Sequence, residues 1–170
     1  GYRYSENFNS HDYSNSFFEM IDSLGLNTAI RYVQNVRKPV SELDRYLNTR
    51  GYIGSDYLND IVGTQCLRNM RYKEAVEYRG AGSKAYQKHL NVYMDYDPFS
   101  IERKPIKLKY EFRYDFACKM YSLEQSLDLP SEPNRKAQLL IEYATGLRNS
   151  FDFCWGLTQY YRGTSYWGQV

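Results

Sequence analysis

Apolar residues recur at intervals of three and four along most of this 170-residue chain, the spacing of a helix with one buried face. The stripes lie at 13–24, 26–33, 43–47, 58–66, 71–78, 108–127 and 137–161. No run of alternating apolar and polar positions compels a strand. The pattern therefore predicts an all-α fold of seven or eight helices, arranged as stacked antiparallel pairs in a single domain over 1–170.

Helix boundaries can be placed at several of the stripes. Gly25 follows the first one, where a left-handed residue often ends a helix. Ser41 with Asp44 three residues later predicts a capped helix start. The last stripe is interrupted by Gly146, Asn149 and Ser150. Either one long kinked helix or two helices would fit it, and we favour two, with a break near 149–150.

The periodicity fades between 80 and 106, where Gly80, Gly82, Pro98 and Pro105 interrupt the sequence. We expect a long connection with one helical turn near 85–90. Connections of this length in a compact domain are usually functional or mobile. The chain begins with Gly1 and not with methionine, so we expect it to be part of a longer protein.

The segment from Val62 to Tyr78 resembles a tetratricopeptide repeat. Val62 and Gly63 stand at the family's large residue and glycine, and Ala75 follows the glycine by twelve residues. Tyr72 takes the place of an aromatic residue on the second helix. The resemblance implies a short solenoid whose concave groove holds peptides or partner proteins.

The resemblance covers about 35 residues, and no second full copy follows at a 34-residue spacing. Asn59, Cys66 and Arg79 stand where the family prefers aromatic residues. The C-terminal part, 143–155, is similar to the end of larger uncharacterised bacterial proteins, a likeness that implies no activity.

Composition narrows the possible functions. The net charge of +2 comes from interspersed acids and bases, whereas a nucleic-acid-binding protein gathers basic residues on one face. Three distant cysteines form neither a zinc pattern nor a complete disulfide framework.

No apolar run reaches the roughly 18–20 residues of a membrane span. The compartment stays open, and a cell-envelope or extracytoplasmic location is possible if the full-length chain carries a signal.

The residues that usually carry catalysis are sparse. The two histidines, His11 and His89, lie outside any nucleophile motif. Asp95 and Asp97 lack the series of oxygen ligands that calcium requires. The glycine-containing stretch 80–84 lacks the spacing of a phosphate-binding loop. We therefore expect no catalytic, cofactor or metal site.

A non-catalytic module that binds a protein or peptide remains the favoured interpretation. The residues expected to contact the partner are Asn59, Asn69, Arg148, Asn149 and Trp167. The alternative is a carbohydrate-binding helical protein, because 19 tyrosines and two tryptophans could offer rings on which sugars stack. We expect most of the tyrosines to serve helix packing.

Overall fold

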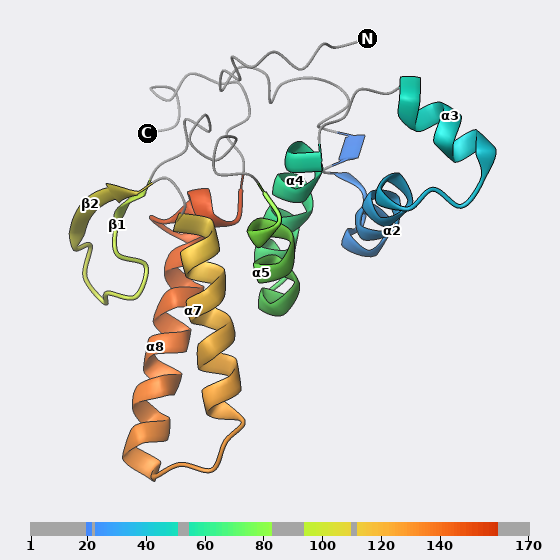
Figure 1. Cartoon of the computed structure of the whole chain (residues 1–170). Helices are drawn as coiled ribbons and strands as arrows, with labels where there is room; N and C mark the ends of the chain where they lie inside the picture. Colours follow the sequence, from blue (N-terminus) through green and yellow to red (C-terminus); the bar gives the residue numbers. More distant parts are fainter. Residues whose placement is uncertain (1–19, 22, 51–54, 83–93, 110–111, 160–170) are drawn as a thin grey trace.

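The computed structural model describes residues 20, 21, 23–50, 55–82, 94–109 and 112–159. Helices dominate these residues, as the sequence predicted. They are α2 (Leu26–Arg37), α3 (Glu42–Arg50), α4 (Ser55–Arg68), α5 (Tyr72–Gly80), α7 (Phe112–Leu127) and α8 (Pro133–Phe151), followed by the 3₁₀ turn η2 (Trp155–Leu157). Two short strands, β1 (Met94–Tyr96) and β2 (Pro105–Lys109), complete the described structure (Figure 1). The expected stripe at 13–24, the turn at 85–90 and the tail with Trp167 fall largely or wholly outside these residues.

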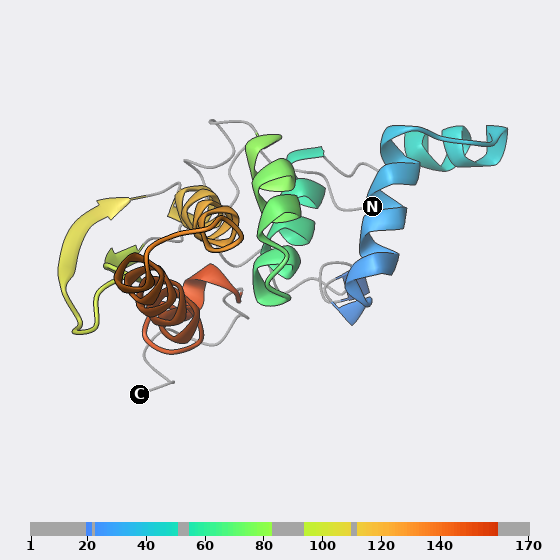
Figure 2. The same cartoon turned by 90° about the horizontal axis from the view of Figure 1, so that it is seen from below.

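Apart from α3, the helices pack in the order in which they follow one another. Helix α2 packs on α4, α4 on α5, α5 on α7, and α7 on α8. Seen from below, α3 and α2 lie at one end of the molecule, and α8 with the two strands lies at the other (Figure 2). The α7–α8 hairpin projects away from the remaining helices (Figure 1).

Helix α4 forms the centre of the core because it has neighbours on several sides. Every residue from Tyr57 to Leu67 is buried, and α4 contacts α2, α5 and η2. The inward positions predicted for this helix and for α5 are confirmed, namely Leu58, Ile61, Val62, Cys66, Tyr72 and Ala75. Burial raises the pKa of the Cys66 thiol to about 12, which leaves it protonated at neutral pH.

The turn between α4 and α5 contains a strained residue. Met70 has a φ of 57°, in the left-handed region where a side chain costs free energy. The Arg71 N–H donates to the Cys66 carbonyl at 2.9 Å, and the Met70 N–H donates to the Leu67 carbonyl at 3.1 Å. This pair of bonds is the Schellman arrangement, in which glycine usually takes the left-handed position.

We expect Met70→Gly to raise the free energy of unfolding by about 1 kcal/mol, because glycine adopts this φ without strain. Urea denaturation would measure the change. The control is Asn69→Gly, one residue earlier and without a positive φ, which should lower stability. Equal losses from both substitutions would contradict this view of the turn.

Two short strands, which the sequence did not predict, lie within or just after the stretch 80–106 that was expected to be a long connection. Strands β1 and β2 pair antiparallel, with Met94 opposite Lys109 and Tyr96 opposite Pro105. The sequence from Ile106 to Lys109 alternates apolar and polar residues, a short strand signal. Helix α7 begins after β2, at Phe112. Leu108, which was expected to be the first apolar residue of this helix, belongs to β2.

The break that the sequence predicted near 149–150 occurs just after these residues, where α8 ends at Phe151 and a turn leads to η2. The Asn149 amide donates to the Pro98 and Ser100 carbonyls at 2.9 and 2.8 Å, and the Ser150 hydroxyl donates to the Leu147 carbonyl at 2.7 Å. Both polar side chains are therefore satisfied inside one helix that continues to Phe151.

The face of α8 that packs inward is also not the one its apolar stripe predicted. Leu139, Gly146, Asn149 and Ser150 are buried, whereas Leu140 and Ile141 are 50% and 58% exposed. A Cβ at Gly146 would lie 2.6 Å from a ring carbon of Phe99 and 2.9 Å from the Met120 sulfur. Because a side chain would not fit at this position, the side of α8 that carries Gly146 can pack closely against the core.

Candidate functional site

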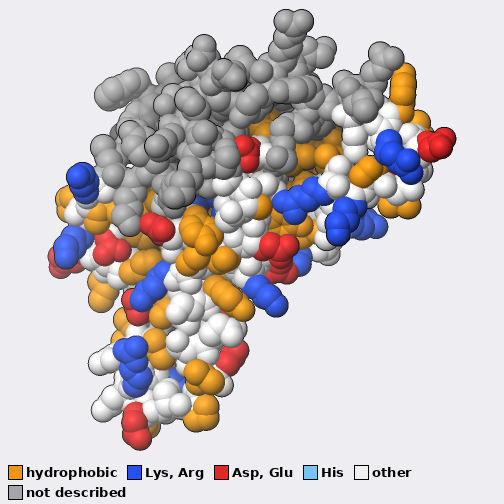
Figure 3. Space-filling view, in the orientation of Figure 1, with side chains coloured by type: hydrophobic (Ala, Val, Ile, Leu, Met, Phe, Trp, Pro, Cys, Tyr) orange, Lys and Arg blue, Asp and Glu red, His pale blue; other side chains and the backbone are white. Residues whose placement is uncertain are grey.

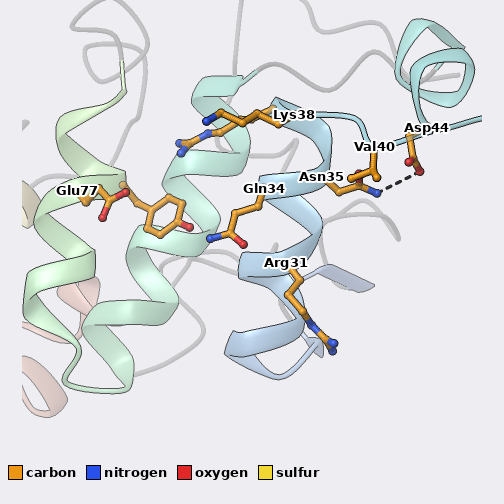
Figure 4. Close-up of a pocket in the computed structure, with 9 residues that line it drawn as sticks. Arg31, Gln34, Asn35, Lys38, Val40, Asp44 and Glu77 are labelled. Carbon is orange, nitrogen blue, oxygen red and sulfur yellow. Dashed lines mark hydrogen bonds between the residues drawn. The ribbon is translucent and has the colours of Figure 1, made fainter. Parts of the chain in front are cut away.

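A groove of about 650 Å³ lies between α2, the α2–α3 connection and α5. Gln34 of α2 and Lys38, which follows α2, point toward α5, from which Glu77 projects, whereas Arg31 extends to the other side of α2 (Figure 4). The complete lining is Arg31, Gln34, Asn35, Arg37, Lys38, Val40, Asp44, Glu77 and Tyr78. Seven of the nine lining residues are therefore polar or charged.

Arg37 joins α2 to both α4 and α5 beside the groove. Its guanidinium donates to the side-chain oxygen of Asn59 on α4. The guanidinium carbon also lies 5.1 Å from the centre of the Tyr78 ring on α5, within the range of a cation–π contact. Burial raises the pKa of the Tyr78 hydroxyl, so the ring presents a neutral phenol. The floor of the groove is therefore held in place by contacts within the protein.

The carboxylate of Asp44 is already occupied by the start of α3. It accepts hydrogen bonds from the Ser41 hydroxyl at 2.8 Å, the Ser41 N–H at 2.9 Å and the Asn35 amide at 3.1 Å. These bonds, those from Ser41 foremost, lower the pKa of Asp44. The helix start predicted at Ser41 and Asp44 is confirmed by this arrangement.

The remaining charges give the groove a basic character. Within the described part of the chain, Arg31 and Lys38 form no ion pair, and Arg37 is bonded to a neutral amide. Glu77 is the single carboxylate of the lining that no described hydrogen bond or ion pair engages. An acidic group that enters the groove would find more positive than negative charge.

An apolar surface continues from the groove along α3. Val40 is 86% exposed and Leu43 is 64% exposed, and Tyr46 and Leu47 expose more than half of their surface. Leu43, Tyr46 and Leu47 follow helical spacing and share one face of α3. Val40 lines the groove and lies in the connection two residues before α3 begins. We call the groove and the α3 face together the α2–α3 surface.

The α3 face is exposed because α3 touches the remainder of the described structure at few points. The Asn48 amide donates to the Val36 carbonyl at 3.1 Å, and Asn35 bonds Asp44. Both contacts lie on the side of α3 that faces α2. The stripe at 43–47 identified α3 as a helix, but it did not reveal that the apolar side faces solvent.

The structure does not bring the predicted contact residues together. Asn59 is buried behind Arg37, and Asn149 is buried against the Pro98 and Ser100 carbonyls. Asn69 is exposed at the α4–α5 turn, where its amide donates to the Gln65 carbonyl at 2.8 Å. Arg148 is exposed on α8, at the opposite end from α3, and Trp167 lies outside the described residues.

Another group of charges, in the core, has a structural role. Asp60 of α4 pairs with Arg79 of α5 and lies 3.5 Å from a guanidinium nitrogen of Arg113 on α7. Arg113 also donates to the Gly156 carbonyl at 2.7 Å and to the Gln159 carbonyl at 3.0 Å. All three charged side chains are at most 3% exposed. The cluster therefore connects three helices and the segment after α8.

The sequence indicates only part of the groove, namely which residues of its lining share one side of a helix. Arg31, Gln34 and Lys38 are spaced three and four residues apart, which places them on one side of a helix. The contact of Arg37 with Tyr78 spans 41 positions and depends on how α2 packs against α5. Among the residues that the structure describes, no group of three or more histidines, cysteines and acidic residues is placed to hold a metal ion.

Comparisons with protein-family models, with curated proteins and with solved structures find no match to this chain. None of the described helices is both long and apolar enough to cross a membrane.

Proposed function

We propose that this protein is a non-catalytic, helical interaction module that binds a protein partner at the α2–α3 surface. The observation that carries the proposal is that an exposed apolar face of α3 follows directly, along the chain, on the exposed Val40 of a basic groove. Large exposed apolar patches on soluble proteins often mark interaction sites. The partner segment would place apolar side chains on α3 and an acidic side chain in the groove.

A protein segment fits this surface better than a small polar ligand does. Leu43, Tyr46 and Leu47 offer aliphatic and aromatic side chains at the spacing by which one amphipathic helix packs against another. Arg31 and Lys38 would steer an acidic segment toward the groove and fix its orientation. Since Arg37 and Tyr78 are already held by each other, the partner would meet a preformed floor.

The wider architecture of this proposal is a short helical solenoid. The sequential packing of α2, α4, α5, α7 and α8 supports it, since each helix of a solenoid mainly contacts its neighbours. The tetratricopeptide-like spacing of Val62, Gly63, Tyr72 and Ala75 falls on the paired helices α4 and α5. A scaffold or assembly role follows from such an architecture.

The double substitution Leu43→Glu with Leu47→Glu tests the apolar part of the surface. We expect at least a roughly tenfold loss of partner binding, because two apolar anchors are replaced by charged groups. Protein stability should change by less than about 1 kcal/mol, since both positions are exposed. The measurement is capture of proteins from an extract of the source cells with wild-type and variant bait, followed by titration of the captured protein.

The matched control is Leu140→Glu with Ile141→Glu, which makes the same kind of change on exposed positions of α8. It should leave binding of this partner unchanged. Equal capture by wild-type protein and both variants would contradict the proposal, and so would equal loss from both.

A carbohydrate-binding function is the second candidate, and one observation favours it. Phe151 and Trp155 are 48% and 39% exposed and lie four residues apart, so two ring faces are accessible near the end of α8. Sugars stack on such rings. Retention of the protein on a polysaccharide, lost on Trp155→Ala but kept in the α3 double variant, would favour this function over partner binding.

A further inference from the structure

The far end of the α7–α8 hairpin is a short loop with acidic and apolar side chains. Residues 128–132 join the two helices, and all of them are exposed. Asp128 is the first residue of this loop and Glu132 is the last, and Leu129 between them is 63% exposed. Acidic and apolar side chains are visible at the end of the hairpin, which projects from the molecule (Figure 3). We call residues 128–132 the hairpin tip.

The two acids of the hairpin tip are available to another molecule. Neither Asp128 nor Glu132 forms an ion pair with any residue that the structure describes. Glu132 stands at the position before α8, yet its side chain makes no capping bond to the helix. Arg135 and Lys136 follow within the first turn of α8, so the charges of the loop itself are negative.

The groove of the α2–α3 surface carries the complementary charges. Lys38 points toward α5 on one side of α2, and Arg31 extends to the other side (Figure 4). Both are exposed, and neither forms an ion pair within the described ranges. Two cations therefore flank α2, and two acids flank Leu129 in the hairpin tip. Complementary charges of this kind attract two surfaces and fix their orientation.

The apolar side chains and the shape of the molecule agree with this match. Leu129 is an exposed aliphatic side chain, as are Val40 in the groove and Leu43 and Leu47 on α3. The hairpin projects away from α2 and α3 (Figures 1 and 2), so its tip does not reach the groove of its own molecule. A hairpin tip that enters a groove therefore belongs to another copy of the chain.

We propose that the partner of the α2–α3 surface is a second copy of this chain, and that the hairpin tip of this copy enters the groove. Leu129 then packs against the apolar side chains of the surface, and Asp128 and Glu132 lie beside Arg31 and Lys38. The inference rests on the proposed function, since it names the partner of the same surface.

The contact is head to tail, because the tip and the groove are different parts of the chain. Such contacts add further copies until a ring closes or an open chain grows. A loop tip buries less than a standard interface of about 1,600 Å², so the assembly is weak and forms at micromolar or higher concentration.

Two charge-reversed variants test the contact. The tip variant carries Asp128→Lys with Glu132→Lys, and the groove variant carries Arg31→Glu with Lys38→Glu. Sedimentation of the wild-type protein at rising concentration should show species larger than a dimer. Each variant alone should associate at least roughly tenfold more weakly, because like charges then meet at every contact.

Mixing the two variants tests which surfaces meet. An equimolar mixture should recover the association of the wild type, because each tip can again find a groove of opposite charge. The matched control is Glu102→Lys with Asp152→Lys, which makes the same change of charge at exposed acids outside the tip. It should associate like the wild type.

Far-UV circular dichroism establishes that the variants fold, and recovery on mixing shows that each one keeps its unaltered surface. A wild-type protein that stays monomeric at several hundred micromolar would overturn the proposal. Variants that associate like the wild type, or a mixture that does not recover, would overturn it equally.

The outcome for the proposed function is separate. Capture of a different protein, lost in the Leu43→Glu, Leu47→Glu variant, together with a monomeric wild type would uphold partner binding at the α2–α3 surface. The same result would overturn the identification of the partner as a second copy.

Discussion

Replacing Asp60 with asparagine is expected to lower the free energy of unfolding by about 3–5 kcal/mol, the range for breaking a buried ion pair by removing one partner. The Asp60 carboxylate pairs with Arg79 and lies 3.5 Å from Arg113, and all three side chains are at most 3% exposed. Asparagine has nearly the same size and shape as aspartate, so the loss would come from charge and not from volume. The change leaves two buried guanidinium groups without the carboxylate that both approach.

Chemical denaturation of wild-type protein and Asp60→Asn measures this effect. The control is Glu77→Gln, which removes a carboxylate at an exposed position of α5 and should alter stability by less than about 0.5 kcal/mol. A loss below about 1 kcal/mol for Asp60→Asn would mean that the cluster is not needed to hold α4, α5 and α7 together.

Tyr72→Ala is expected to cost about 3–5 kcal/mol, the usual range for removing a large aromatic side chain from a core. Tyr72 begins α5 and is 1% exposed. The centre of its ring lies 6.2 Å from those of Phe116 on α7 and Tyr143 on α8, in edge-to-face geometry with both. One side chain therefore joins α5 to the α7–α8 hairpin.

The control for this prediction is Tyr72→Phe, which keeps the ring and removes only the hydroxyl. It should cost about 1 kcal/mol, the net value of a typical hydrogen bond. Thermal or urea unfolding of the two variants measures both effects. Similar costs for alanine and phenylalanine would contradict the view that the ring joins these helices.

Sequence periodicity predicted the parts of the fold in which a helix has one clear apolar side. It located α4 and α5 and their inward residues, and the spacing of Ser41 and Asp44 predicted the start of α3. These features depend on neighbours within a few residues, so a local pattern is sufficient. The two strands were missed because β1 spans three residues and β2 five, and such segments give a weak periodic signal.

Helix α8 shows where periodicity was insufficient. Its apolar residues form a stripe, yet the small and polar residues Gly146, Asn149 and Ser150 face the core. Gly146 does so because Phe99 and the Met120 sulfur occupy the space beside it. Asn149 does so because the carbonyls of Pro98 and Ser100 need donors. Both reasons involve residues far away in the sequence.

The dependence on residues far away in the sequence also explains why the candidate site was not predicted. Polar residues such as Asn59 and Asn149 were expected to contact a partner, but each instead satisfies a buried group of the protein. The α2–α3 surface exists because α3 lies beside α2 with its apolar face outward, and the sequence pattern does not specify this placement. Exposure of a helix face is a tertiary property, and the pattern of residues along the chain is the same whether that face is buried or exposed.

Hydrogen–deuterium exchange of the complex tests partner binding at the α2–α3 surface most directly. The protein captured from the source extract is added to the chain at saturation, and exchange is compared with that of the free chain. We predict slower exchange in α2 and α3, with α7 unchanged. Protection confined to α8 and η2, or a change only when an oligosaccharide is added, would contradict the account.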